Sequence, residues 1–532
     1  MSRVAPGWDL AVVALGKGAL SLAVLSTGFV ALSDDDFSRI VIAEEFVHSP
    51  SLDPSGTSWL PLPFWVHGTS MSLFGRTLAT AHATSLMLGV ISALCIHRAA
   101  RWLRVSRPGS VLTALIASGI LTAARLGVST QPEALTAGLV VLGAAATRVD
   151  GSRRMIGGVA LLAACLCRYE AWAAGAVFVL IAAYDAARGP RKQRGRDVLS
   201  SGFAPLDTER QYAGESDPPA PDDAEVAEAA EAASARDPRD PRRRLTLLAA
   251  AALAAAGPLA WIVHGAVSHD DALFFLHRVA AYRRALGATE PVVRSLFAYP
   301  TALFRAEPEV TLSALLVLRV AADRAPRALA LLVRPTLVIG GVFVFLVVGR
   351  VLDGAPTHHA ERTLLPAWTL LSVLVGEGLV RGLTPVRGHV RGDAVARTVP
   401  LAIAIGVLSL LLRAGKPPEP DAARKAERDI GIAARSRVAE TERLLIDTRD
   451  YGYFAVIAAF GAPERARPVD RHDPREPHPE EAFASEERLS ELLHSSGARW
   501  LAVRADDLPV AARLGTVTDA AGDLSLLRVS LP

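Results

Sequence analysis

Long apolar stretches alternate along this chain with short polar segments that are rich in arginine. Most of the apolar stretches approach the ~20 residues that a helix needs to cross a hydrocarbon layer of ~30 Å, and they predict about eleven membrane-spanning helices. The predicted spans are 10–32, 77–97, 109–128, 132–147, 155–168, 171–186, 245–266, 301–321, 334–350, 363–380 and 398–413. We therefore expect a mostly α-helical, multi-pass membrane protein.

The basic segments predict how these spans are oriented. Arginine is concentrated in 97–107, 148–154, 188–196, 323–334 and 381–397. All five lie on one side of the membrane if the N-terminus is cytoplasmic, as the positive-inside rule requires. The alternative of a cleaved signal peptide at 10–32 is disfavoured because Asp9 and Lys17 break the usual order of charged and apolar residues.

This orientation places longer loops on the outer face of a bacterial inner membrane. They are a first loop at 33–76, a loop at 267–300 and the segment 351–362. Everything after about residue 414 also lies outside.

Two segments differ from the membrane domain, 1–413. Residues 187–244 are rich in Pro, Asp, Glu, Arg and Ala, which is typical of a disordered cytoplasmic linker. Residues 414–532 predict a small α/β domain outside the membrane, with strands at 443–448, 499–504 and 524–530 and an amphipathic helix at 485–497.

Composition narrows the function classes. The chain is 51% hydrophobic and 21% charged, with a formal net charge of only +3, so its local arginine clusters indicate topology and not a nucleic-acid partner. Cys95, Cys165 and Cys167 all lie inside apolar runs. Their placement argues against a disulfide framework and against a cysteine zinc site.

The first outer loop carries an acidic triplet, Asp34, Asp35 and Asp36, directly after the first span. The stretch "DDFSRIVIAEEF" predicts an interfacial helix capped by Asp34 or Asp35, with Phe37, Ile40, Val41 and Phe46 available to the membrane. Later in the loop, Trp59, Phe64 and Trp65 suit the headgroup layer. The triplet could be only a helix cap with solvated charge, or it could supply a base to a lipid-borne substrate.

In this arrangement the chain resembles the GT-C superfamily of membrane glycosyltransferases, which includes protein O-mannosyltransferases and lipid A aminoarabinose transferases. The residues that carry the resemblance are "DDDFSRIVIAEEF" after the first span, "SWLPLPFW" later in the same loop and "HHAERTLLPAW" at 358–368. The "HPP" stretch of many relatives is replaced here by "WLPLP".

The resemblance implies a hexosyl- or pentosyltransferase that uses a polyprenyl-phosphate sugar and a lipid, glycan or protein acceptor. It also implies a single displacement with inversion. By alignment with the family pattern, Asp35 is the expected base, Asp34 the second candidate and Asp36 the third, with Glu45 as the later acid.

A departing lipid phosphate requires cationic groups at the same membrane face. The full set of substrate-binding candidates is Arg39, Glu45, Trp59, Glu133, Arg168, Glu170, Arg278, Arg283, His358, His359 and Arg362. Simpler explanations exist for several of them. Arg278 and Arg283 could form the polar face of an interfacial helix, and Arg168 and Glu170 could pair with each other in a tight turn.

No cofactor is expected, although a divalent metal at His358 and His359 is left open. Two other functions compete with glycosyl transfer. A transporter or a lipid or polysaccharide flippase would place ionisable residues deep in its spans, and a non-catalytic partner of a glycan export complex would keep its function without the triplet.

Overall fold

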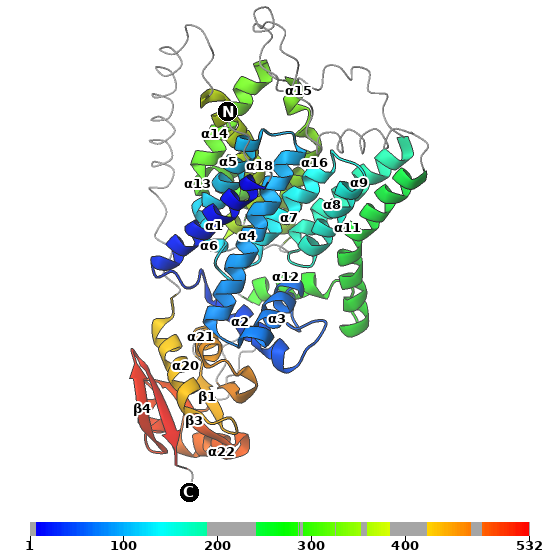
Figure 1. Cartoon of the computed structure of the whole chain (residues 1–532). Helices are drawn as coiled ribbons and strands as arrows, with labels where there is room; N and C mark the ends of the chain where they lie inside the picture. Colours follow the sequence, from blue (N-terminus) through cyan, green and yellow to red (C-terminus); the bar gives the residue numbers. More distant parts are fainter. Residues whose placement is uncertain are drawn as a thin grey trace, which may run out of the picture.

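The fold has two parts, a helical bundle and an α/β domain at one end of it (Figure 1). The computed structural model describes residues 7–188, 241–285, 287, 291–324, 326–352, 359–383, 423–448, 450–469 and 481–530. Most of the predicted linker lies outside the described residues, as do the predicted span 398–413 and His358. The chain is mostly helical with a small C-terminal sheet, as the apolar pattern predicts.

Each predicted span within the described residues is occupied by helix. These helices are α1 (Trp8–Ser26), α4 (Leu78–Trp102), α5 (Arg107–Gly119) with α6 (Leu121–Leu126), α7 (Glu133–Ala146), α8 (Ser152–Cys165), α9 (Glu170–Arg188), α11 (Pro241–Ser268), α13 (Val292–Ala306) with α14 (Pro308–Arg324), α16 (Val333–Val351) and α18 (Leu365–Leu383). Among the described helices, α1, α4, α9, α11 and α16 are long and apolar enough to cross a membrane.

Two predicted spans are each divided into two helices. One breaks at Ile120 and the other between Ala306 and Pro308. At the second break Glu307 is buried, and its carboxylate accepts hydrogen bonds from the backbone N–H and the hydroxyl of Thr122, at 2.8 and 2.6 Å. Thr122 lies in the first turn of α6, so this carboxylate satisfies donors that the start of a helix leaves unpaired. A hydrogen-bonded contact therefore joins the two breaks.

Segments from the two predicted sides lie at opposite ends of the bundle. Figure 1 shows α15 (Pro326–Leu329), in a basic segment, at one end. At the other end lie α2 (Asp34–His48), α3 (Leu62–Phe74) and α12 (Phe274–Ala285), next to the C-terminal domain. The acidic triplet and the C-terminal domain thus share one end of the molecule.

The C-terminal domain is built around a five-stranded sheet in the order β2-β1-β3-β5-β4. Its strands are β1 (Arg443–Asp447), β2 (Ala466–Val469), β3 (Ala498–Arg504), β4 (Gly515–Ala521) and β5 (Leu524–Val529), and its helices are α20 (Lys425–Arg437), α21 (Tyr453–Phe460), α22 (Glu486–Ser496) and α23 (Leu508–Ala511), with a 3-10 turn η2 at Pro463–Arg465. Strands β2, β1 and β3 are parallel, whereas β3, β5 and β4 are antiparallel. All three predicted strands are confirmed, and the predicted helix ends at Gly497, whose φ of 66° suits glycine.

The acidic triplet opens α2, but neither predicted residue caps the helix. Ser33 stands at the N-cap position, and Asp36, at the third helical position, accepts hydrogen bonds from the N–H groups of Leu32 and Ser33 at 3.0 and 3.3 Å. This is the capping-box arrangement, in which the acid reaches back to donors that precede the helix. The cap predicted at Asp34 or Asp35 is therefore wrong.

The apolar face of α2 meets protein where lipid was expected. Phe37, Ile40 and Val41 are buried in one apolar cluster with residues of α20 and α21 from the C-terminal domain. Phe64, expected in the headgroup layer, is buried as well. Amphipathic periodicity shows which face of a helix is apolar, but it does not identify the partner that covers this face.

The interface between α2 and the C-terminal domain also buries a carboxyl group. Glu44 is fully buried, and neither of its oxygens has a hydrogen-bond partner among the described residues. Next to it, Arg76 forms a two-pronged ion pair with Glu464 at 2.8 and 3.0 Å, and Arg435 donates to the carbonyl oxygen of Arg76 at 2.8 Å. Burial raises the pKa of Glu44 well above its usual range, against the opposing effect of Arg76 and Arg435.

We expect Glu44→Gln to stabilise the fold at neutral pH by about 1–3 kcal/mol, because it removes an uncompensated buried acid. The pKa of Glu44 is 4.5 in the unfolded chain and higher in the folded protein. The wild type therefore loses stability as the pH rises from 4.5 to the pKa of the folded state, because the unfolded chain gives up this proton first. The gain should therefore shrink as the pH is lowered towards 4.5. Thermal unfolding of the detergent-solubilised protein at neutral pH and near pH 4.5 measures this gain in stability. The control is Glu45→Gln, which changes the exposed neighbour. Equal melting shifts for both variants would contradict the burial argument.

Candidate functional site

The three aspartates at the start of α2 have different surroundings. Asp34 is held by Arg424 of the C-terminal domain, through two hydrogen bonds of 2.8 Å from Nε and Nη2 to the two carboxylate oxygens. Asp36 is buried in the opposite direction, towards the bundle. Asp35 is exposed, and its carboxylate makes no hydrogen bond or ion pair with any residue that the structure describes. Of the three candidate bases, Asp35 is the most exposed, whereas the Asp34 side chain is 25% exposed and both of its oxygens are held by Arg424.

Asp36 joins α2 to the loop before α7. The N–H of Thr130 donates to Asp36 Oδ1 at 2.9 Å, and the Thr130 hydroxyl lies 2.9 Å from the carbonyl oxygen of Asp36. Burial raises the pKa of Asp36, while Arg362 and the hydrogen bonds oppose this shift. A carboxyl group with this many fixed partners has a framework role, in which it sets the position of α2 against the bundle.

The structure brings together three of the predicted site residues, from two helix starts and the turn between α8 and α9. Arg168 forms ion pairs with Glu133 at 2.9 Å and with Glu170 at 2.8 Å. Both glutamates are the first residues of helices, α7 and α9, where a carboxylate also favours the helix dipole. The two carboxylates raise the pKa of Arg168 even though burial opposes this, so its charge is permanent.

Arg39 lies one helical turn after Asp35 and connects it to this group. Its guanidinium is buried and lies 4.4 Å from the centroid of the Trp59 ring, a cation–π contact. It interacts electrostatically with Glu133 and with Asp35, and burial lowers the pKa of Arg39. Its Nε has no acceptor among the described residues. This buried donor is therefore left unsatisfied among the described residues.

Arg362 reaches the same place from α17 (Ala360–Thr363), just before α18. Its side chain is buried and interacts electrostatically with Asp36 and Glu133. Its Nη2 is also without an acceptor among the described residues. Arg39 and Arg362 thus present two unsatisfied, buried cationic donors close to an accessible carboxylate.

The bundle next to this cluster has little empty space. A cavity of about 20 Å³ is lined by Thr130 and Gln131, which contact Asp36, and by apolar residues of α3, α4 and α7. This volume holds about one water molecule. This cavity is therefore too small to hold a sugar.

The remaining candidates lie around the cluster or away from it. Arg278 and Arg283 are on α12, which packs near Arg168 through Phe275 and Tyr169, with ring centroids 4.5 Å apart. His359 pairs with Glu361 at 3.2 Å at the start of α17. Glu45 is exposed at the far end of α2, about 15 Å along the helix from Asp35.

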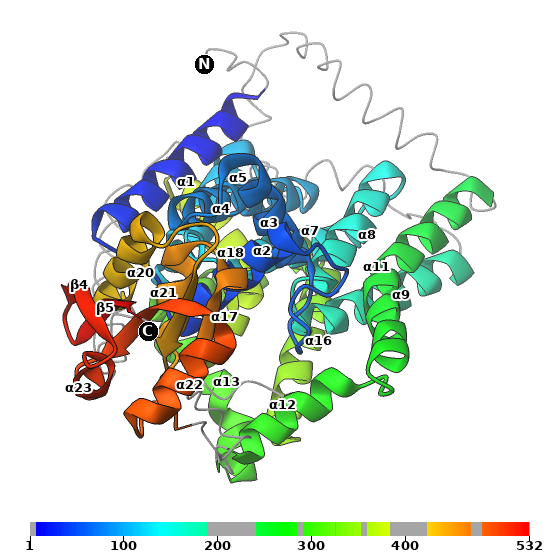
Figure 2. The same cartoon turned by 90° about the horizontal axis from the view of Figure 1, so that it is seen from below.

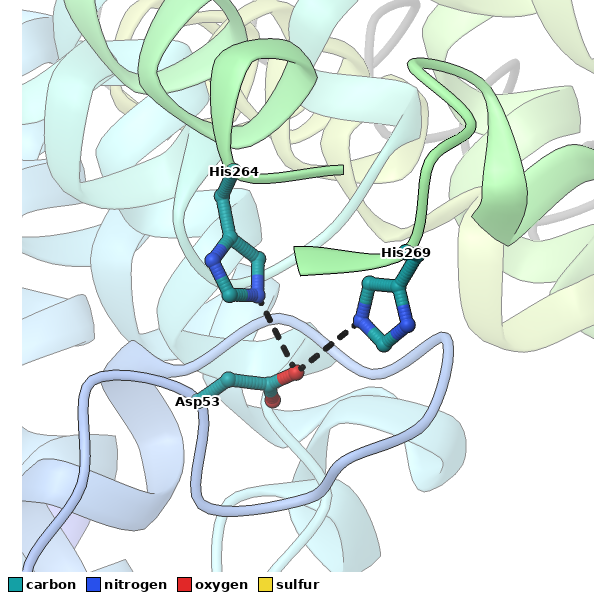
Figure 3. A group of neighbouring side chains, drawn as sticks. All are labelled: Asp53, His264 and His269. Atoms are coloured by element: carbon teal, nitrogen blue, oxygen red, sulfur yellow. Dashed lines mark hydrogen bonds and ion pairs between the residues drawn. The ribbon is translucent and has the colours of Figure 1, made fainter. Parts of the chain in front are cut away.

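A second group of side chains has the composition of a metal site. Asp53 Oδ2 lies 3.4 Å from His264 Nε2 and 3.9 Å from His269 Nε2, and Figure 3 shows both imidazoles turned towards this carboxylate. One ligand atom from each residue lies within 4.8 Å of the others. Two imidazoles and a carboxylate suit zinc or a similar divalent cation, and the Ser268 hydroxyl, 3.1 Å from His264 Nδ1, would orient one ring.

Sequence reasoning missed this group and considered His358 and His359 in its place. Asp53 and His264 are 211 positions apart, so no spacing motif connects them. The available signal was weak. His264 lies near the end of the predicted span 245–266, and His269 follows it by five residues in the loop 267–300, which the orientation places at the same membrane face as Asp53.

The fold is similar to that of two solved structures of ArnT over nearly the whole chain. The structure of ArnT, a lipid A aminoarabinose transferase, from Cupriavidus metallidurans bound to undecaprenyl phosphate superposes with a TM-score of 0.57 and 15% identity, over 98% of this chain and 98% of that one. Its apo structure gives a TM-score of 0.53 at 15% identity, over 96% and 97%. The oligosaccharyltransferase AglB from Archaeoglobus fulgidus gives 0.49 at 13% identity, over 96% and 72%. No protein-family model and no curated protein sequence matches this chain.

Proposed function

We propose that this protein is a glycosyltransferase that moves a sugar from a polyprenyl phosphate to a lipid, glycan or protein acceptor at the outer face of a bacterial inner membrane. One observation carries the proposal: the exposed carboxylate of Asp35 interacts electrostatically with the buried Arg39, and Arg39 and Arg362 each keep a donor without a partner among the described residues. The likeness of the fold, over nearly its whole length, to a protein bound to undecaprenyl phosphate supports it.

The proposed reaction is a single displacement. Asp35 accepts the proton of an acceptor hydroxyl while that oxygen forms a bond to the anomeric carbon of the sugar. The bond from this carbon to the lipid phosphate oxygen breaks at the same time, and its electron pair leaves with the phosphate. Attack from the face opposite the leaving group inverts the anomeric configuration.

Arg39 and Arg362 would bind the departing phosphate. Their free donors are buried, so hydrogen bonds to phosphate oxygens replace no well-solvated contacts and gain strength from the low local dielectric. Arg168 has a different role in this proposal, because its guanidinium already forms ion pairs with Glu133 and Glu170. It holds the starts of α7 and α9 together beneath the site.

Binding of undecaprenyl phosphate to the protein in nanodiscs tests the lipid part of this proposal. We expect Arg362→Ala to weaken this binding about 10- to 100-fold, which corresponds to the loss of hydrogen bonds to a charged group. The control is Arg381→Ala, which removes a cation that pairs with Glu377 near the other end of α18. Unchanged binding in Arg362→Ala, or an equal loss in the control, would contradict the assigned phosphate site.

For the divalent metal we propose Asp53, His264 and His269 as ligands, with a structural role. A bound cation would join the loop after α2 to the end of α11, since the ligands come from both segments. It would supply charge neutralisation and rigidity there, and no step of the proposed reaction depends on it.

Zinc is expected to raise the melting temperature of the apo protein. At a hundredfold excess of zinc over its Kd, the free energy of unfolding should rise by about 2.7 kcal/mol. His264→Ala should abolish the effect, whereas His277→Ala, which removes a histidine paired with Asp271 outside this group, should retain it. Melting curves with and without chelator measure the effect, together with the zinc content of the purified protein. A melting temperature that zinc leaves unchanged would exclude the site.

A further inference from the structure

The N-terminus of α2 is held on two sides by different parts of the molecule. Arg424 holds Asp34 from the C-terminal domain, and Thr130 holds Asp36 from the bundle. Successive residues of a helix point about 100° apart, so these two side chains point in nearly opposite directions. Two fixed points of this kind determine the rotation of α2 about its own axis, and with it the direction of Asp35.

The side chain of Arg424 is itself part of a charge network. It pairs with Glu427 at 3.2 Å and with Asp450 at 3.0 Å, and Asp450 pairs with Arg504 at 3.2 Å. Hydrogen bonding to Asp34 is the main reason why the pKa of Arg424 is raised. The guanidinium therefore stays charged and has little freedom to turn away.

This network lies at the edge of the sheet where α/β domains usually bind ligands. Asp450 follows β1 and Arg504 ends β3, and these are neighbouring parallel strands. Side chains at the carboxyl ends of such strands commonly form binding sites. Here this edge faces α2 of the membrane domain, and Arg424 donates its hydrogen bonds to the carboxylate of Asp34.

Apolar packing fixes the same contact more broadly. Phe37 and Ile40 of α2 are buried in the cluster that contains Ile430 of α20 and Val456 of α21. Figure 2, seen from below, shows α20 and α21 beside the segment that carries α2 and α3. The C-terminal domain thus contacts both the start of the acidic helix and its apolar face.

We propose that the C-terminal domain is part of the catalytic machinery and that Arg424 is a positioning residue, which aims Asp35 by fixing the rotation of α2. This inference rests on the proposed function, in which Asp35 is the base. Arg424 does not touch the substrate in this proposal. Its effect passes through Asp34, and a misplacement of the base by about 1 Å can lower the rate about 100-fold.

Steady-state kinetics of variants in nanodiscs test the proposal, with a panel of undecaprenyl-phosphate monosaccharides as donors. We expect Arg424→Ala to lower kcat about 10- to 100-fold and to leave the KM for the donor unchanged. Arg424→Lys should recover part of the rate, since it keeps the charge but loses the two-pronged contact.

Arg437→Ala is the matched control, because Arg437 forms an ion pair with Asp519 inside the C-terminal domain, on the side of α20 that faces β4. Equal kcat values for Arg424→Ala and Arg437→Ala would overturn the positioning role. If Asp35→Asn is inactive in the same experiment, the proposed function survives that result. Full activity of Asp35→Asn would overturn the proposed function itself.

A labelling measurement tests the geometry without any sugar. The thiol of Asp35→Cys should react with a membrane-impermeant maleimide, and the native cysteines all lie within the helical bundle. Adding Arg424→Ala should change the labelling rate several-fold, whereas adding Arg437→Ala should not. Equal rates in the two backgrounds would overturn the proposal even if no donor in the panel is used.

Discussion

Replacing Asp35 by asparagine should lower kcat about 100- to 10,000-fold, the usual contribution of a positioned general base. The amide has nearly the same shape as the carboxylate but cannot accept the proton of the acceptor. Asp35 is exposed and has no partner among the described residues, so the fold should be unaffected. The measurement is sugar transfer by purified protein, alongside binding of undecaprenyl phosphate, which should be unchanged.

Two neighbouring variants separate catalysis from general acidity. Glu45→Gln changes an exposed acid at the far end of the same helix and should leave the rate unaltered. Asp36→Asn should lower stability more than Asp35→Asn does, because Asp36 accepts hydrogen bonds from Leu32, Ser33 and Thr130. Equal rates in wild type and Asp35→Asn would remove Asp35 as the base.

Replacing Arg168 by methionine should cost about 3–5 kcal/mol of stability, the usual result of breaking a buried ion pair from one side. The reason lies in its partners. Glu133 and Glu170 are both buried, and Arg168 contacts both. Without it, two carboxylates remain close together with less compensation. Thermal unfolding in detergent measures the loss.

The triple variant Arg168→Met, Glu133→Gln, Glu170→Gln provides the control for this result. It removes the buried charges together with the arginine, so much of the lost stability should return. A melting temperature as low as that of Arg168→Met alone would show that packing of the arginine stem, and not charge compensation, explains the loss.

Much of the membrane domain could be predicted from the sequence. Spans such as 77–97 and 245–266 are revealed by apolar length alone, and α4 and α11 confirm them. The two broken spans were missed, although Pro308 is a local signal for the second break because the residue before a proline disfavours helix. The contact between Thr122 and Glu307, 185 positions apart, could not be found from the sequence. In the C-terminal domain the three buried strands were found from their apolar runs. The short edge strand β2 and the more exposed edge strand β4 were not, since their side chains are less consistently apolar.

The candidate site was predicted as a set of residues but not as an arrangement. The loop, its triplet and the arginines came from charge position and from the family resemblance. The structure brings Asp36, Arg39, Glu133, Arg168, Glu170 and Arg362 into one cluster. It also revealed the metal-like group at Asp53, which no local spacing could indicate.

The sequence by itself indicated where the apolar helices lie and which loop carries the acids, because both follow from the periodicity and composition of contiguous residues. Only the tertiary structure decided which aspartate is exposed without a partner among the described residues. Asp34 and Asp36 are occupied by Arg424 and Thr130, residues 390 and 94 positions away. Helix rotation depends on such distant contacts, and three adjacent aspartates are chemically identical until the fold points each of them in its own direction.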